Sequence, residues 1–333
     1  MALPASGAIS LSDFNTELGI TAGTQISMND ADVRALLGLS SGAEASFSDY
    51  YGASSSVDIA LTIASNTNNY NIFSSKGGSY VAGKTNVTLT VNSGVSVGST
   101  STGTYALETG TGWASGDTIT VINNGTVKGR GGNGGVGGSR AGAGFGQAPF
   151  VTTPSAAGST GGNAFRAQFA TAFTNNGSVY GGGGGGGGGG SATTLIIGYK
   201  GAAGWVGGSG GGGGAGVTGS SGGAGGTADF LDANNNPVAG VTGASGGSGT
   251  STSGGGGGAS QTMGDASGGQ GGNGGGLGSD GGAGADGVST AGTAPSNFVE
   301  SGKAGGTRGY YQVGASFINS GSGISGTRAG RSG

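Results

Sequence analysis

The sequence contains neither histidine nor cysteine in its 333 residues. The absence of cysteine excludes disulfide bonds and thiol nucleophiles, and the absence of both residues excludes zinc sites built from these ligands. Histidine is also the commonest general base, so most enzyme classes are disfavoured. No pair of carboxylates stands out as a catalytic dyad, although Glu108 and Asp117 stay candidates in a β-rich region. We therefore expect no enzyme activity and no cofactor.

Charge and long apolar segments are also scarce. Charged residues make up 8% of the chain and the net charge is -3, which fits neither a nucleic-acid-binding surface nor an acidic tail. No apolar run approaches the ~20 residues needed to span a bilayer. The first ten residues, MALPASGAIS, lack the basic and apolar segments of a signal peptide. We expect a chain that is made in a cytoplasm and binds no nucleic acid.

Glycine is the residue in excess, since 90 of the 333 residues are glycine, roughly four times the usual share. Its distribution divides the chain into residues 1–55, 56–128 and 129–333, of which only the last is glycine-rich. We predict a mainly β and irregular fold. It comprises a small N-terminal helical segment, a β-rich module and a packed assembly of the glycine-rich runs.

A short motif of the form x-Ser-apolar-Ser/Asn-Asp recurs in the first region. Its copies are residues 9–13 (ISLSD), 26–30 (ISMND) and 45–49 (ASFSD). The Ser or Asn side chains are candidate helix N-caps, with Asp13 and Asp30 in first turns, where negative charge suits the helix dipole. Gly19 and Gly38 follow as stop signals. The pattern predicts two or three short helices.

Apolar and polar residues alternate between residues 57 and 127, as in residues 57–63, 87–91 and 119–121. This period of two predicts β-strands, whose exposed edges need a partner. The module is therefore a candidate for homotrimer formation. Residues 78–85 (GSYVAGKT) match the Walker A pattern, but a strand-like segment follows them where the phosphate-binding loop requires a helix.

The glycine runs after residue 128 are interrupted by apolar segments such as 194–197 (TLII) and 228–231 (ADFL), which a flexible linker does not need. Glycine loses the most backbone entropy on folding, so ordered runs must pair their amides. The polyproline II geometry has three residues per turn and no internal hydrogen bonds. Helices without Cβ atoms can approach on every side, which predicts a polyglycine II sandwich.

An internal similarity predicts the direction of these runs. Residues 120–127 (TVINNGTV), 172–179 (AFTNNGSV) and 316–323 (SFINSGSG) each precede a glycine-rich stretch, so we expect all three to enter from one end, termed proximal. The outward runs are then 181–190, 222–226, 254–258 and 281–287, and the returning runs are 207–216, 240–249 and 268–278. Links at the opposite, distal end are long: 139–160, 191–206, 227–239, 259–267 and 288–303.

Large apolar residues concentrate in these distal links. An exposed apolar patch at one end of a molecule marks a binding surface, and aromatic anchors are favoured at interfaces. The candidate receptor-binding residues are Phe145, Phe150, Ile196, Tyr199, Trp205, Phe230, Leu231, Met263 and Phe298. We expect Phe165, Phe169 and Phe173, which are spaced by four, to pack against the flank of the glycine assembly instead.

Glycine runs alternating with apolar-tipped segments, after residues 123–132 (NNGTVKGRGG), resemble the glycine-rich tail-fibre tip adhesins of T-even-like phages over residues 120–333. The resemblance implies a polyglycine sandwich whose distal loops bind an outer-membrane protein of a Gram-negative host. It implies a virion protein made in the host cytoplasm. Residues 1–55 depart from those adhesins and are similar to the starts of phage tail and structural proteins. They imply attachment to other virion proteins, on a tail fibre, hub or capsid.

Other functions remain open from the sequence alone. A structural fibre or decoration protein would use its loops only for contacts within the virion. Ice binding would require a strict Gly-x-x period, and a depolymerase would degrade surface polysaccharide. Residues 281–288 (GGAGADGV) match one calcium-binding nonapeptide, but a single copy cannot supply six to eight oxygens, so we expect Asp286 to be a loop carboxylate.

Overall fold

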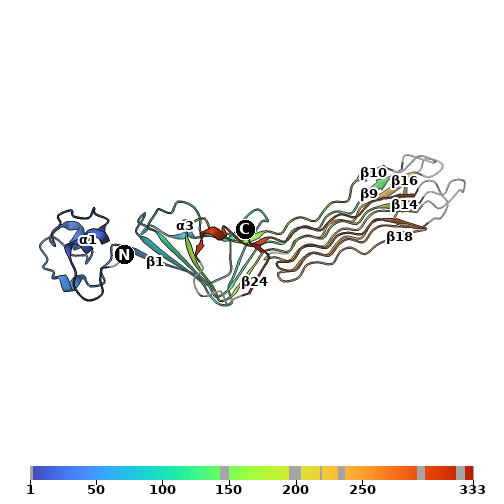
Figure 1. The fold of residues 1–333 in the computed structure, drawn as a ribbon. Coiled ribbons are helices and arrows are strands. Elements are labelled where there is room, and N and C mark those ends of the chain that lie inside the picture. The colour runs from blue at the N-terminus through green and yellow to red at the C-terminus, as the bar shows by residue number, and fades with distance from the viewer. Residues whose placement is uncertain are drawn as a thin grey trace.

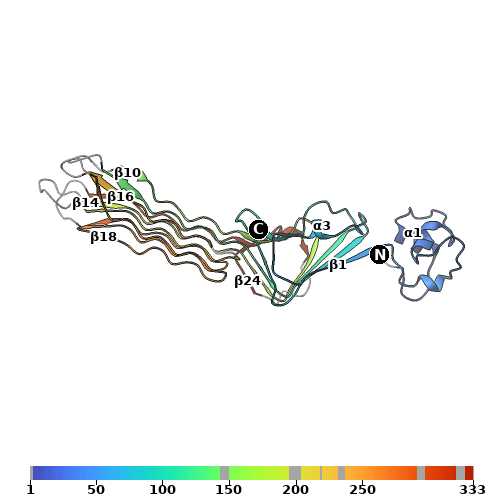
Figure 2. The same cartoon turned by 180° about the vertical axis from the view of Figure 1, so that it is seen from behind.

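A computed structural model describes residues 3–142, 150–194, 204–217, 220–231, 237–290, 297–319 and 327–332. The molecule is elongated and has three parts in a row: a small helical domain, a middle part of β-strands and a bundle of extended segments (Figure 1). The reverse view shows the same order (Figure 2). No helix in the described ranges is long and apolar enough to cross a membrane.

The N-terminal domain contains α1 (Leu11–Leu18), α2 (Ala31–Ala35) and the 3-10 helix η1 (Phe47–Tyr50). In each motif copy the backbone amide of the serine donates to the aspartate carboxylate three residues later, at 2.7, 2.8 and 2.7 Å. Asp13 lies in the first turn of α1, as predicted. Asp30 is instead the N-cap of α2, because that helix begins one residue after it.

The middle part consists of three five-stranded sheets in which every pairing is parallel. The first sheet contains β1 (Val57–Ile63), β4 (Thr85–Val91), β7 (Thr118–Asn123), β12 (Thr171–Asn175) and β23 (Ile318–Asn319). The second contains β2 (Thr67–Asn68), β5 (Ser96–Gly98), β8 (Thr126–Lys128), β13 (Ser178–Tyr180) and β24 (Thr327–Ala329). The third contains β3 (Tyr70–Asn71), β6 (Tyr105–Glu108), β11 (Asn163–Arg166), β22 (Tyr310–Val313) and β25 (Arg331–Ser332).

These strands form a solenoid, because the chain visits the first, second and third sheet in turn and does so five times. A short helix, α3 (Ile72–Ser75), follows β3. Alternate residues of β4 are buried, as the period of two predicted, and Leu89 pairs with Val121, which pairs with Phe173. The strand after the Walker A match is β4, so that segment lacks the helix that phosphate binding needs.

The three phenylalanines at 165, 169 and 173 belong to the solenoid. Phe165 and Phe173 are 1% and 4% exposed in its core and stack with ring centroids 4.9 Å apart, and Phe169 packs against the same core. The expectation that they pack against the glycine assembly is therefore wrong. Phe165 lies on β11 and Phe173 on β12, and both strands belong to solenoid sheets whose buried side chains form this core.

Two of the three similar segments are structurally equivalent. Asn123 pairs with Asn175 and Val127 with Val179, which is the alignment of the sequence copies. In the third copy Ile318 pairs with Thr171, three residues away from the sequence match. Residues 327–332 then form β24 and β25, so the expectation that this copy opens another glycine run is wrong. The last coil follows the strand ladder of the solenoid instead.

The glycine runs occupy two excursions from one corner of the solenoid, between β8 and β11 and between β13 and β22. Ten runs lie side by side: 129–138, 156–162, 181–190, 207–216, 220–226, 240–249, 254–258, 268–278, 281–287 and 302–309. We call them the glycine array. Their backbone hydrogen bonds show that neighbouring runs point outward or return as predicted, since runs 220–226, 254–258 and 281–287 are antiparallel to returning runs.

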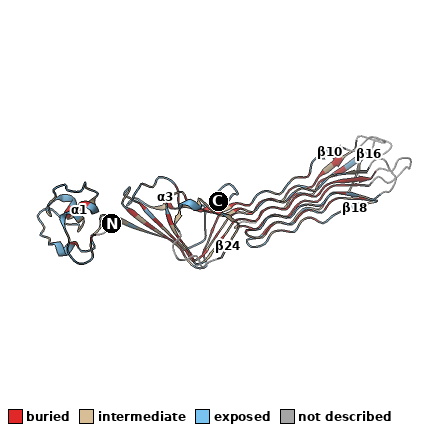
Figure 3. Ribbon diagram, in the orientation of Figure 1, coloured by how far each residue is buried: buried red, intermediate tan, exposed pale blue. Residues whose placement is uncertain are grey.

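Two runs form the interior of the array. Run 181–190 is bonded to six neighbours, and run 207–216 is also bonded to six, which arranges the ten runs in layers of three, four and three. A Cβ at any residue of 181–190 would lie only 1.7 to 2.1 Å from a backbone carbonyl oxygen. Only glycine fits there, and buried residues follow the array along its length (Figure 3).

Candidate functional site

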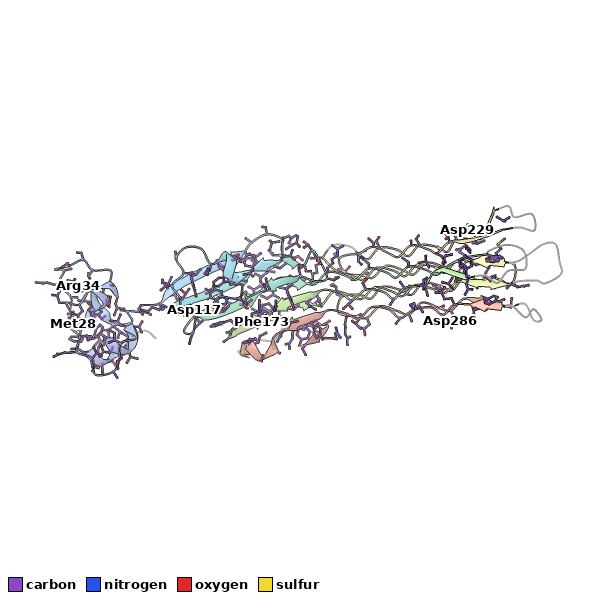
Figure 4. All side chains as sticks on the ribbon, turned by 90° about the horizontal axis from the view of Figure 1, so that it is seen from above. Met28, Arg34, Asp117, Phe173, Asp229 and Asp286 are labelled. Carbon is purple, nitrogen blue, oxygen red and sulfur yellow. The ribbon has the colours of Figure 1, made fainter. Side chains whose placement is uncertain are left out.

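The candidate site is the end of the array that lies farthest from the solenoid, here called the tip. Links at the solenoid end are short, such as 250–253 and 279–280, whereas the tip links are long and contain strands. The view with side chains places Asp229 and Asp286 near this end (Figure 4). The Asp286 carboxylate accepts the Gly302 amide at 2.9 Å, from the neighbouring run.

Three small sheets build the described part of the tip. The first orders β10 (Phe150–Thr153), β9 (Ser139–Ala141), β16 (Ala228–Leu231) and β17 (Pro237–Ala239). The second orders β15 (Gly204–Val206), β14 (Ala192–Thr194) and β21 (Asn297–Val299), and the third orders β18 (Thr262–Met263), β19 (Ala266–Ser267) and β20 (Val288–Ser289). Each sheet joins strands from different links, so the links support one another.

Three predicted contact residues have described side chains at partly accessible positions. Phe150 begins the edge strand β10 and is 51% exposed. Phe298 is half-buried and pairs with Thr193. Met263 packs against a small core formed by Ala192, Val206 and Ala266. Phe150 is thus the most accessible of these three to a partner.

Trp205 lies inside the tip, with only 3% of its surface exposed. A Cβ added at Gly142 would come 2.3 Å from its ring, so the indole occupies space that a larger residue would need. Trp205 is paired with Thr193 in the second sheet. The indole is therefore part of the interior of the tip, and a direct contact with a receptor stays a prediction.

The remaining predicted residues lie partly or wholly outside the described structure. Phe145, Ile196 and Tyr199 fall in ranges that the structure does not describe. Phe230 and Leu231 are on β16, where their backbones pair with Val238 and Pro237, but their side chains are not described.

Three exposed apolar residues of the tip were missed by the sequence analysis: Val151 (38% exposed), Val288 (50%) and Val299 (53%). Size and aromatic character marked the predicted contact residues, whereas these three are β-branched residues on short strands. With Phe150 they are the exposed large apolar side chains in the described part of the tip. The β propensity of valine was the signal that could have identified them.

A polar cluster of buried Arg140, Ser155 and Ser191 around the half-buried Glu300 lies where the array meets the tip. Glu300 Oε1 accepts the Ser155 amide at 2.6 Å, and Glu300 Oε2 accepts the Ser191 hydroxyl at 2.7 Å. The Ser191 hydroxyl in turn accepts Arg140 Nε at 2.8 Å. Burial acts to raise the pKa of Glu300, but hydrogen bonds from Ser155 and Ser191 outweigh it and hold that pKa below its ordinary value.

The carboxylates considered for catalysis have structural partners. Asp117 is 6% exposed and accepts the Tyr80 hydroxyl at 2.7 Å and the Ala114 amide at 2.8 Å, which fixes two loops of the solenoid. Glu108 accepts the Asn71 amide at 2.8 Å and lies 4.0 Å from Arg166. Within the described ranges, no cluster of His, Cys, Asp or Glu is suited to hold a metal ion.

Comparison with known proteins gives one family and one solved structure. The family described as phage tail fibre adhesin Gp38 matches residues 58–333. The structure of the gp37-gp38 adhesin tip complex of the bacteriophage S16 long tail fibre is similar at 20% identity and a TM-score of 0.44, over 97% of this chain and 95% of that chain. No curated protein matches. The chain belongs to the phage tail fibre adhesin Gp38 family, whose members are non-enzymatic receptor-binding proteins of the virion.

Proposed function

We propose that this adhesin binds a protein in the outer membrane of a Gram-negative host through the loops of its tip. The observation that carries the proposal is that four large apolar side chains are exposed on tip strands, namely Phe150 and Val151 on β10, Val288 on β20 and Val299 on β21. Exposed apolar side chains gathered at one end favour a binding role. The undescribed segments 143–149, 195–203 and 291–296 add Phe145, Ile196 and Tyr199 to the same links.

We further propose that the array consists of polyglycine II helices. Residues 182, 185 and 188 donate to run 156–162, residues 183, 186 and 189 to run 207–216, and residues 184, 187 and 190 to residues 279–285. This period of three is the period of the polyproline II geometry. Non-glycine residues of the outer run 129–138 recur with the same period, at Arg130, Asn133 and Val136. Such a bundle is a stiff carrier that holds the loops away from the virion.

The helical domain is proposed to attach the adhesin to another tail fibre protein. Its repeated motif exposes Leu11 (40%) and Phe47 (42%) at equivalent positions in the first and third copies, and Met28 in the second copy borders a depression of about 580 Å³. In the S16 long tail fibre structure, gp38 is in complex with gp37. The three solenoid sheets all form within one chain, where each strand pairs with a strand of a neighbouring coil, so the pairing of the described strands requires no homotrimer. The mass of the purified protein tests its oligomeric state.

Replacement of residues 195–203 by a Gly/Ser segment of equal length tests the binding role. This change keeps strands β14 and β15, which pair at 192–194 and 204–206. We expect phage adsorption to host cells to fall while the thermal unfolding temperature stays the same. The matched control replaces the proximal link 250–253. Unchanged adsorption after the first replacement would contradict recognition by this loop and favour a structural role.

The class of receptor is tested on the cell surface. Protease treatment of host cells should abolish adsorption of the unmodified phage, because the proposed receptor is a protein. Periodate oxidation of surface sugars should leave adsorption unchanged. Adsorption that survives protease treatment but is lost after periodate oxidation would indicate a polysaccharide receptor and contradict the proposed protein receptor.

A further inference from the structure

Four residues at the base of the tip form a connected polar cluster, which we call the clamp: Arg140, Ser155, Ser191 and Glu300. Besides the contacts given above, Glu300 Oε1 lies 3.0 Å from the Ser155 hydroxyl, and the Glu300 backbone amide donates to the Ser191 carbonyl at 2.9 Å. Arg140 is 4% exposed, Ser155 4% and Ser191 0%. The Arg140 guanidinium is buried deeply enough to need the opposite charge of Glu300, since an unpaired buried charge is strongly unfavourable.

The clamp joins the ends of four particular runs. Runs 129–138 and 181–190 leave solenoid strands β8 and β13, and runs 156–162 and 302–309 lead back into β11 and β22. These are the runs whose proximal ends are fixed by solenoid strands. Arg140, Ser155, Ser191 and Glu300 lie within two residues of the distal ends of the same four runs. The four runs are therefore fixed at both ends.

The array itself cannot define how its distal ends align. Its hydrogen bonds repeat every three residues, so a run displaced by three residues, roughly 9 Å, would remake equivalent bonds. Interior glycines have no side chains that would distinguish one alignment from another. Strand pairing in the solenoid sets the proximal ends of the anchored runs, and the clamp supplies side chains of specific shape and charge that distinguish one alignment of their distal ends.

We propose that the clamp is a positioning site for receptor recognition. It aligns the distal ends of the four anchored runs and thereby sets the relative positions of the first, second and fifth tip loops, without contacting the receptor. The first loop lies between Arg140 and Ser155 in the chain, the second begins after Ser191, and the fifth ends before Glu300. The role in recognition rests on the proposed receptor-binding function, whereas the alignment of the loops does not.

Distances between spin labels test the alignment in the purified full-length protein. The natural chain has no cysteine, so Val151→Cys and Val299→Cys place labels only at two exposed positions, on the first and fifth loops. We expect one narrow distance distribution in the otherwise natural chain. Glu300→Gln, which removes the charge, and Ser191→Ala, which removes the bridging hydroxyl, should each broaden it. Distributions that stay narrow in both folded variants would overturn the proposal.

Asp280→Asn is the matched control. Asp280 contacts Arg308 at 3.9 Å in the same array but at the proximal end, and its side chain is 58% exposed. This change should leave the label distances unaltered. A variant that only lost stability would show a lower unfolding temperature, with a narrow distribution well below it.

Adsorption of phage carrying each variant to host cells tests the role in recognition. Glu300→Gln and Ser191→Ala should lower the adsorption rate by roughly tenfold, and Asp280→Asn should not change it. Broadened distances with normal adsorption would overturn the role of the clamp in recognition. Failure of the unmodified adhesin to bind cells would contradict the proposed function instead, and the label distances would still decide whether the clamp aligns the loops.

Discussion

Alanine at Gly186 should disrupt the interior of the glycine array. A Cβ at this position would lie 2.0 Å from the Gly272 carbonyl oxygen, so the two runs must separate. Separation strains the neighbouring bond from the Gly272 amide to the Gly187 carbonyl, which is now 2.8 Å. Overpacking costs about 1 to 3 kcal/mol and each weakened hydrogen bond about 1 kcal/mol, partly offset by up to ~1 kcal/mol from a less flexible unfolded chain.

We therefore expect Gly186→Ala to destabilise the array by about 1 to 4 kcal/mol, which for a domain of this size lowers its unfolding temperature by roughly 2 to 16 °C. Calorimetry of the purified protein measures this change. Gly256→Ala is the control, since a Cβ there meets nothing within 4 Å. Its only effect is on the unfolded chain, so it should stabilise by about 0.4 to 1 kcal/mol. Equal unfolding temperatures for the two variants would refute the close packing of interior runs.

Three further predictions concern the solenoid and the tip. Asn123→Ala removes the 2.7 Å bond to Asn175, leaves that buried amide without this donor, and should destabilise the solenoid by about 1 to 3 kcal/mol in thermal unfolding. Phe150→Ala should reduce adsorption without lowering the unfolding temperature, because the ring is 51% exposed; normal adsorption would remove Phe150 from the binding surface. The folded pKa of Glu300 is lowered, so its contribution to stability is complete above the ordinary carboxyl pKa of about 4.3 and is lost as the pH falls through the folded value. The pH dependence of unfolding should therefore weaken in Glu300→Gln.

Local signals in the sequence predicted local structure well. Ser10 and Asp13 form a capping box, Gly19 ends α1 in the left-handed conformation, and the alternation of residues 85–91 forms β4. The direction of the glycine runs also followed from the sequence, because chain continuity forces a run that leaves the solenoid to return. The predicted boundaries at 55/56 and 128/129 stay predictions. Region 129–333 holds solenoid strands as well as the array.

Pairing between segments that are distant in the chain could not be predicted from local sequence patterns. Phe165 and Phe173 are spaced like a helical face, and only the parallel ladders with β6 and β7 reveal that they lie in the solenoid core. Trp205 has the size of an interface anchor, but its ring is buried and occupies the space that a side chain at residue 142 would fill. Arg140 and Glu300 look like ordinary surface charges in the sequence. Ser155 and Ser191 reach Glu300 across 145 and 109 residues, a separation that no local pattern spans.

The array is inserted into a solenoid, and the two parts are stabilised in different ways. The solenoid has a core of interlocking side chains, such as Leu89, Val121 and Phe173, which specifies one register for each coil. The array is held together by backbone hydrogen bonds, which do not specify one register. Its length and stiffness therefore do not depend on side chains in the interior. Alignment must then be imposed at its two ends, by strand pairing at the solenoid and by the clamp at the tip.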